Sequence, residues 1–125
     1  MTNDESNYFK FERLEVWQHA RRFADNIYGI TSRFPKNELF GITNQLRRAA
    51  ISITLNIAEG SERQPDQDFQ RFLRMALASL HEVLAALYIS QDQNFLDEKT
   101  FQSLHKDASH LSAQIKSFIR ALNKR

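Results

Sequence analysis

Residues that interrupt helices are scarce in this sequence. It holds only three glycines and two prolines among 125 residues, which is too little turn chemistry for a sandwich or barrel of many short strands. The helical spacing of apolar residues is interrupted at only three short segments, 34–37, 60–65 and 92–94. The sequence therefore predicts four long helices, at about residues 12–32, 36–59, 65–91 and 97–122.

The short connections between these helices constrain their arrangement, because helices joined by a few residues pack as antiparallel neighbours. We therefore expect an all-α fold, an antiparallel up-down-up-down four-helix bundle formed by residues 11–123, with residues 1–10 as a flexible N-terminal segment. The sequence has no basic and apolar leader, no apolar run of membrane-spanning length and no cysteine. The chain is accordingly expected to be cytoplasmic and to stay out of membranes.

Local signals mark the expected ends of the helices. Pro35 disfavours helical geometry in the residue before it and can itself open the second helix, where its missing N–H has no helical partner to lose. Gly60 is placed to follow the last residue of the second helix. Asp97 is expected to cap the start of the fourth helix.

The second and third helices each carry more apolar surface than a small bundle needs. The fourth helix is the simple case, with one narrow apolar seam on a polar helix. On the second and third helices, a further set of apolar or small residues lies roughly 100° or more away from the main stripe. We predict that other copies of the chain cover this set in a homo-oligomer; it comprises Phe40, Ile51, Leu55, Ala58, Met75, Ala78 and Ile89.

An alternative interpretation is that the second and third helices are simply the most buried pair within one bundle. The polar side of the second helix also bears on whether this helix contacts another subunit. Ser52, Asn56 and Glu59 share it, and polar residues among apolar contacts often fix the register of helices. We expect these three to line a pore or to set the register of a subunit interface.

No catalytic or metal-binding motif is evident. A glutamate follows His81 as in a zincin helix, but the second histidine that such a site needs is absent. Two acid–histidine pairs lie one turn apart, Glu15 with His19 and Asp107 with His110, yet the Glu-x-x-His motif of di-metal bundles is missing. Gly-rich phosphate loops are missing as well. We therefore expect no enzymatic activity, no metal and no cofactor.

A distinctive run lies in the second helix, where residues 45–60 read QLRRAAISITLNIAEG. It is preceded by LEVWQHA at 14–20 and FPKNE at 34–38, and it is followed by Phe69 and by FLRMA at 72–76. Over about residues 11–123, the chain resembles the four-helix-bundle proteins encoded in intervening sequences of bacterial 23S rRNA genes. The resemblance implies a homopentameric ring of bundles with no known enzymatic activity. That family is also similar in fold to the accessory variability proteins of diversity-generating retroelements, which pair with a reverse transcriptase and bind nucleic acid.

Arginines offer the candidate contacts to nucleic acid, although the formal net charge is only +2. A phosphate-contacting surface repeated around a ring would combine several weak contacts. This interpretation assigns RNA or DNA binding to Arg21, Arg22, Arg47, Arg48 and Arg63. The alternative is that the arginines pair at subunit boundaries with the acidic residues Glu59, Glu62, Asp66 and Asp68.

Two functions are compatible with these features. The first is a non-enzymatic homo-oligomer, a pentamer by the resemblance, that holds RNA, DNA or an RNA-processing partner. The alternative is a purely self-assembling protein of a mobile or intervening element, with no nucleic-acid binding. Binding of nucleic acid that weakens steeply with added salt would favour the first function.

Overall fold

The structure is a computed structural model in which residues 8–125 are described, so the expectation of a flexible segment at residues 1–10 lies mostly outside the described residues. Four long helices make up the fold, and residues 8–125 contain no strand. The helices are α1 (Glu15–Thr31), α2 (Ile42–Ser61), α3 (Asp66–Asp92) and α4 (Glu98–Asn123), with two short 3-10 helices, η2 (Lys10–Arg13) and η3 (Lys36–Glu38). The predicted all-α class and the four helices are confirmed.

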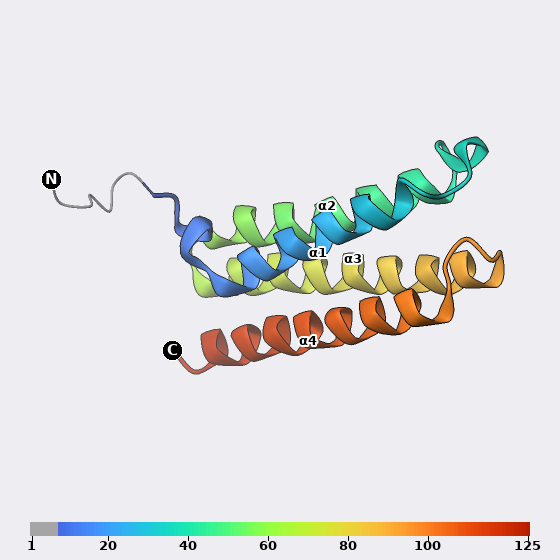
Figure 1. Ribbon diagram of the computed structural model, residues 1–125. Helices are drawn as coiled ribbons and strands as arrows, with labels where there is room; N and C mark the ends of the chain where they lie inside the picture. The colour runs from blue at the N-terminus through green and yellow to red at the C-terminus, as the bar shows by residue number, and fades with distance from the viewer. Residues whose placement is uncertain (1–7) are drawn as a thin grey trace, which may run out of the picture.

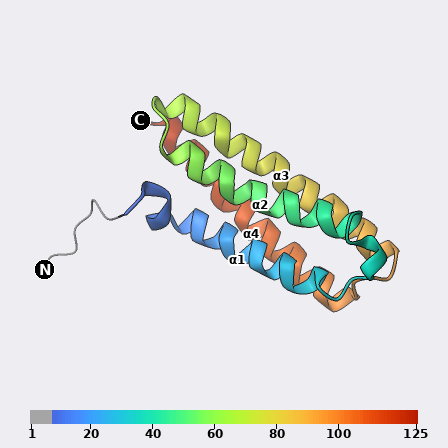
Figure 2. The same cartoon turned by 90° about the horizontal axis from the view of Figure 1, so that it is seen from above.

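The helices lie lengthwise beside one another and form an elongated bundle (Figure 1). The α1–α2 and α3–α4 connections lie at one end, and the α2–α3 connection lies at the other end with Arg125 and the first described residues (Figures 1 and 2). Helices α2 and α3 lie side by side along their lengths (Figure 2). The core between the four helices is fully closed at its centre, where Phe23, Ile53, Leu80 and Ile115 have no exposed surface.

The first two helices begin later than the sequence predicted. Leu14 is extended and separates η2 from α1, which begins at Glu15. The predicted second helix is divided into η3 and α2, because the chain leaves helical geometry at Gly41 before α2 begins. The carboxylate of Glu38 accepts a hydrogen bond from the Ile42 N–H at 3.4 Å, and this N–H has no partner within α2. Leu39, which precedes this helix start, is 48% exposed.

Gly60 has a different role from the one predicted. It lies inside α2 and does not follow its end, and none of the glycines has a positive φ. A Cβ at this position would lie 2.7 Å from the Cβ of Phe72 and 2.9 Å from a ring carbon of Phe69. Glycine is therefore required because α3 approaches closely here, and the left-handed conformation of a helix terminus is not involved.

The start of α4 is as predicted, since the Asp97 carboxylate accepts a hydrogen bond from the Thr100 N–H at 2.7 Å. Along α4 the predicted apolar seam is buried except at Phe118, which is only half-buried and packs against Phe69 at 5.1 Å between ring centroids. Its neighbour Ile119 is buried, and so is Leu122 at the end of the seam. An apolar repeat every 3.5 residues drifts around a straight helix, which accounts for this one-residue shift.

One helix qualifies the expectation about membranes. By length and composition alone, α3 is able to cross a membrane, with a mean hydropathy of 1.5 over its most apolar 18-residue window. The core helix of a soluble protein passes the same test, and 39% of this window is buried inside the bundle. The apolar character of α3 thus reflects both the core that it forms and the uncovered residues on its outward side.

Candidate interaction surfaces

The outward side of α2 and α3 carries several large apolar residues that are exposed. Leu55 is 62% exposed, Ile89 51% and Met75 43%. Ala78 and Ala85 are exposed beside them on α3. We refer to Leu55, Met75, Ala78, Ala85 and Ile89 as the outer face. An apolar surface of this extent along two adjacent helices is characteristic of a contact site.

Two of the residues predicted to lie in an interface are largely covered within the chain. Ile51 and Ala58 are half-buried. They follow Arg47 at helical spacing and therefore lie on the same side of α2. Arg47 contacts Tyr28 and Thr31 of α1, so this side of α2 faces α1. The second apolar stripe of α2 is thus divided between α1 and the outside, and Leu55 is its uncovered residue.

The polar side of α2 joins it to α3 within one chain. The Ser79 hydroxyl donates to the Ser52 hydroxyl at 2.9 Å. The Asn56 amide donates to the Ser52 carbonyl at 2.9 Å and to its hydroxyl at 3.1 Å. These bonds help to set the register between α2 and α3 of one chain, and a role in a pore or at a subunit interface stays a prediction. These bonds give Ser52, Asn56 and Ser79 hydrogen-bond partners within the chain. The apolar residues of the outer face remain exposed.

A shallow groove lies between the start of α2 and the end of α3. It encloses about 520 Å³ and is lined by Ile42, Gln45, Glu82, Ala85, Ala86 and Ile89. Because two of the lining residues are alanines, the groove is open to side chains from outside. Glu82 is the one charged residue in this lining.

Two of the five candidate arginines are held within the chain. The Arg47 Nε donates to the Thr31 hydroxyl at 2.8 Å, and its guanidinium lies 4.5 Å from the centre of the Tyr28 ring. Arg63 pairs with Glu59 at 2.6 Å and lies over the Phe72 ring. The alternative pairing of arginine with Glu59 is therefore present, but inside a single chain. Both side chains therefore make part of their hydrogen bonds within the bundle.

The other three arginines are exposed and distributed along the molecule. Arg21 lies 5.7 Å from the centre of the Trp17 ring, Arg22 faces the α1–α4 side, and Arg48 is exposed on α2. Arg48 and Arg63 are 15 positions apart in the sequence, about 22 Å at helical rise. The five arginines thus form no single patch on one protomer.

The acidic residues proposed as their partners are partly engaged elsewhere. Asp66 pairs with Arg125 at 2.6 Å, and the Arg125 hydrogen bond lowers the pKa of the Asp66 carboxyl from its ordinary value. Glu62 accepts a hydrogen bond from the Lys10 backbone N–H at 3.3 Å. These bonds fasten the first described residues and the last residue to the α2–α3 connection.

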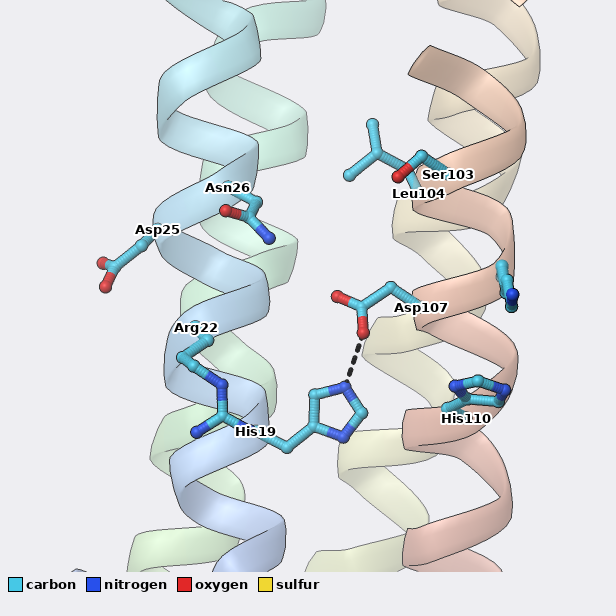
Figure 3. A pocket seen from close by; sticks show the side chains of 9 residues that line it. His19, Arg22, Asp25, Asn26, Ser103, Leu104, Asp107 and His110 are labelled. Atoms are coloured by element: carbon cyan, nitrogen blue, oxygen red, sulfur yellow. Dashed lines mark hydrogen bonds and ion pairs between the residues drawn. The ribbon is translucent and has the colours of Figure 1, made fainter. Parts of the chain in front are cut away.

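A polar groove between α1 and α4 contains an interaction that the sequence did not reveal (Figure 3). It encloses about 540 Å³ and is lined by Arg22, Asp25 and Asn26 of α1 and by Ser103, Lys106 and His110 of α4. At its floor, His19 Nε2 lies 2.7 Å from Asp107 Oδ1 (Figure 3), and His19 Nδ1 lies 2.7 Å from Gln114 Oε1.

The structure pairs His19 across helices. The sequence suggested Glu15 as the neighbour of His19 and His110 as the neighbour of Asp107, because the members of each pair lie one helical turn apart. The partners actually joined are 88 and 95 positions apart, and no local spacing carries that information. Both ring nitrogens of His19 therefore have a partner within the bundle. Within residues 8–125, no three His, Asp or Glu side chains gather into a group able to hold a metal ion.

Comparison with known proteins supports the fold and identifies the family. The chain is similar to a crystal structure of a protein of unknown function from the S23 ribosomal protein family of Bacteroides thetaiotaomicron. The two share 23% identity and a TM-score of 0.78, over 84% of this chain and 95% of that one. No curated protein matches the chain. The family model of the 23S rRNA-intervening sequence protein matches residues 12–117, and the chain therefore belongs to the 23S rRNA-intervening sequence protein family.

Proposed function

We propose that this antiparallel up-down-up-down bundle is a non-enzymatic, cytoplasmic scaffold that assembles with copies of itself into a ring, a pentamer by family resemblance. The observation that supports the proposal is the outer face. Leu55, Met75 and Ile89 expose large apolar side chains although the core beneath them is complete. Burying such residues against another subunit removes apolar surface from water at about 25 cal/mol per Å², and the fold gives them no internal partner.

The experiment is to place charge on the outer face without disturbing the core. The variant Leu55→Lys with Met75→Lys should remain folded, because both side chains are exposed. Sedimentation velocity should show an oligomer for the original chain and a monomer for the variant at the same concentration. Desolvating two unpaired ammonium groups in an interface is strongly unfavourable.

The matched control is Ser117→Lys with Ala121→Lys. These residues are exposed on α4, and the control adds the same charge away from the outer face. It should assemble like the original chain, and circular dichroism should show equal helix content in all three proteins. A chain that is monomeric before any substitution would overturn the proposal.

Nucleic-acid binding is the second candidate function, and the exposure of Arg21, Arg22 and Arg48 favours it. A ring repeats these three cations in every subunit, so contacts too weak alone act together. An electrophoretic shift with structured RNA and duplex DNA should then weaken steeply as salt is raised. Triple substitution of these arginines by glutamine should abolish the shift and leave assembly intact. Failure of the original ring to bind either nucleic acid at low salt would leave self-assembly as the function.

A further inference from the structure

Phe40 is the most exposed large hydrophobic residue of the described chain, at 91%. It lies in the α1–α2 connection at the end of the bundle that also holds the α3–α4 connection (Figure 1). A phenyl ring left this open gives no benefit to an isolated bundle. It resembles instead the aromatic anchors that dominate protein interfaces.

The connection that carries Phe40 is held firmly by the fold. Phe34, at its start, is buried and packs on Phe95 of the neighbouring connection at 5.6 Å between ring centroids. At its end, the Glu38 carboxylate bonds the first N–H of α2 across Gly41, where a Cβ would lie 2.7 Å from a Glu38 oxygen. The segment is therefore fixed at both ends and presents Phe40 outward, so little ordering entropy is lost on docking.

The groove between the start of α2 and the end of α3 has the properties of a receptor for such a ring. Its volume of about 520 Å³ and its alanine lining leave space for one aromatic side chain. The chain's own Phe40 leaves the groove empty, as its exposure shows. Ile42 and Ile89 supply apolar walls.

Phe40 and the groove lie at the same level along the bundle. Phe40 is two residues before Ile42, which lines the groove, and Ile89 is close to the end of α3 at this same end of the molecule. Rotation about an axis parallel to the helices keeps every residue at its level. A copy related by such a rotation brings its Phe40 to the level of its neighbour's groove and covers the rest of the outer face.

The charges around the two features are complementary. Lys36 is exposed on the connection that carries Phe40, while Glu38 of the same connection is engaged at the start of α2. Glu82 is the one charged residue lining the groove. Docking therefore brings a lysine toward a glutamate, which favours one orientation of the two copies.

We infer that Phe40 of one copy inserts into the groove formed by Ile42, Ala85, Ala86 and Ile89 of the next copy, with Lys36 beside Glu82. The inference rests on the self-assembly proposed above and specifies its contact. The Phe40 side chain of each copy enters the groove of one neighbour, and the groove of that copy accepts Phe40 of the other neighbour. A contact of this head-to-tail kind forms a ring of more than two copies when the rotation between neighbours closes, as the proposed assembly requires.

The decisive experiment uses two variants that are defective on opposite sides of the contact. Phe40→Asp removes the inserted ring, and Ala85→Arg blocks the groove; both positions are exposed, so folding is preserved. Each variant alone should associate at least about tenfold more weakly and sediment as a monomer where the original chain is oligomeric. Mixed in equal amounts, they should form a one-to-one dimer, because the Phe40 side chain of the Ala85→Arg variant can enter the open groove of the Phe40→Asp variant.

The control Asn37→Asp adds the same charge to the same connection and should assemble normally. An oligomeric Phe40→Asp protein, or a mixture that stays monomeric, would overturn the inference while self-assembly stood. An original chain that is itself monomeric would overturn self-assembly first, so the two failures are distinguishable.

A charge exchange tests the orientation independently. Lys36→Glu and Glu82→Lys should each raise the dissociation constant about two- to fivefold, the range of exposed ion pairs. Both changes in one chain should restore the original value, since each contact then again joins opposite charges. Additive weakening in the double variant would contradict the proposed pairing.

Discussion

Gly60 shows how one residue determines the distance between two helices. Its Cα faces Phe72 and Phe69 so closely that a methyl group has no space. Gly60→Ala should destabilise the fold by about 1–2 kcal/mol, because overpacking costs about 1–3 kcal/mol and the better helix propensity of alanine returns only part of it.

Gly29 is the matched control for this substitution. It lies in α1, and nothing lies within 4 Å of a Cβ added there. Gly29→Ala should therefore stabilise the protein by about 0.5–1 kcal/mol through helix propensity alone. Urea denaturation of both variants checks the pair, and equal effects with the same sign would contradict the close approach at Gly60.

His19 and Asp107 form the second test at the scale of residues. A double-mutant cycle with His19→Ala and Asp107→Ala should give a coupling free energy of about 1 kcal/mol, because the bond between them is half-buried. A parallel cycle of His19→Ala with Glu15→Ala should give a coupling near zero. Thermal or urea unfolding of the six proteins measures both couplings, and the reverse order of couplings would restore the local pairing that the sequence suggested.

At the scale of elements, the start of α4 makes stability depend on pH. The hydrogen bond from the Thr100 backbone N–H lowers the pKa of Asp97 from its ordinary value of 3.8. A carboxyl whose pKa is lowered by folding stabilises the native state above the ordinary pKa, and this contribution is lost as the pH falls through the lowered value. The cap should thus be fully effective near neutral pH and ineffective in strong acid.

The corresponding substitution is Asp97→Ala. At pH 7 it should lower the unfolding midpoint by about 2–5 °C, the usual effect of losing a cap in a domain of this size. The difference from the original chain should shrink as the pH falls below about 4. Circular dichroism melts between pH 2.5 and 7 measure this, with Asp97→Asn as a control that keeps the cap but removes its charge. A difference that is constant over this range would show that the charge contributes nothing.

The same elements show what a sequence can and cannot predict. Apolar spacing located all four helices, and Asp97 marked a true helix start, since both signals are local. The start of α2 was missed because the chain leaves helical geometry at Gly41, a departure that the apolar spacing does not mark. The His19–Asp107 and Ser52–Ser79 bonds and the packing at Gly60 were beyond reach because they depend on the register between helices, which one-chain periodicity does not encode.

At the scale of the whole molecule, assembly and folding should be linked. If copies associate only when folded, raising the concentration stabilises the native state by mass action. For a chain of this size, the unfolding midpoint should rise by roughly 4 °C per tenfold increase in concentration. Differential scanning fluorimetry over two decades of concentration measures this. The midpoint of the Leu55→Lys, Met75→Lys variant should be independent of concentration, and a concentration-independent midpoint for the original chain would argue against a reversible oligomer.

The η2 helix and the C-terminus lie at the end of the bundle opposite to the α1–α2 connection, which carries Phe40 (Figure 1). In a rotationally symmetric assembly, any polypeptide joined before Tyr8 or after Arg125 would leave every subunit on one rim. Fluorescent proteins or enzymes fused at either position would be displayed in a cluster of fixed spacing, while the rim bearing the aromatic contacts stayed clear. The proposed ring would thus carry all attached proteins on one side.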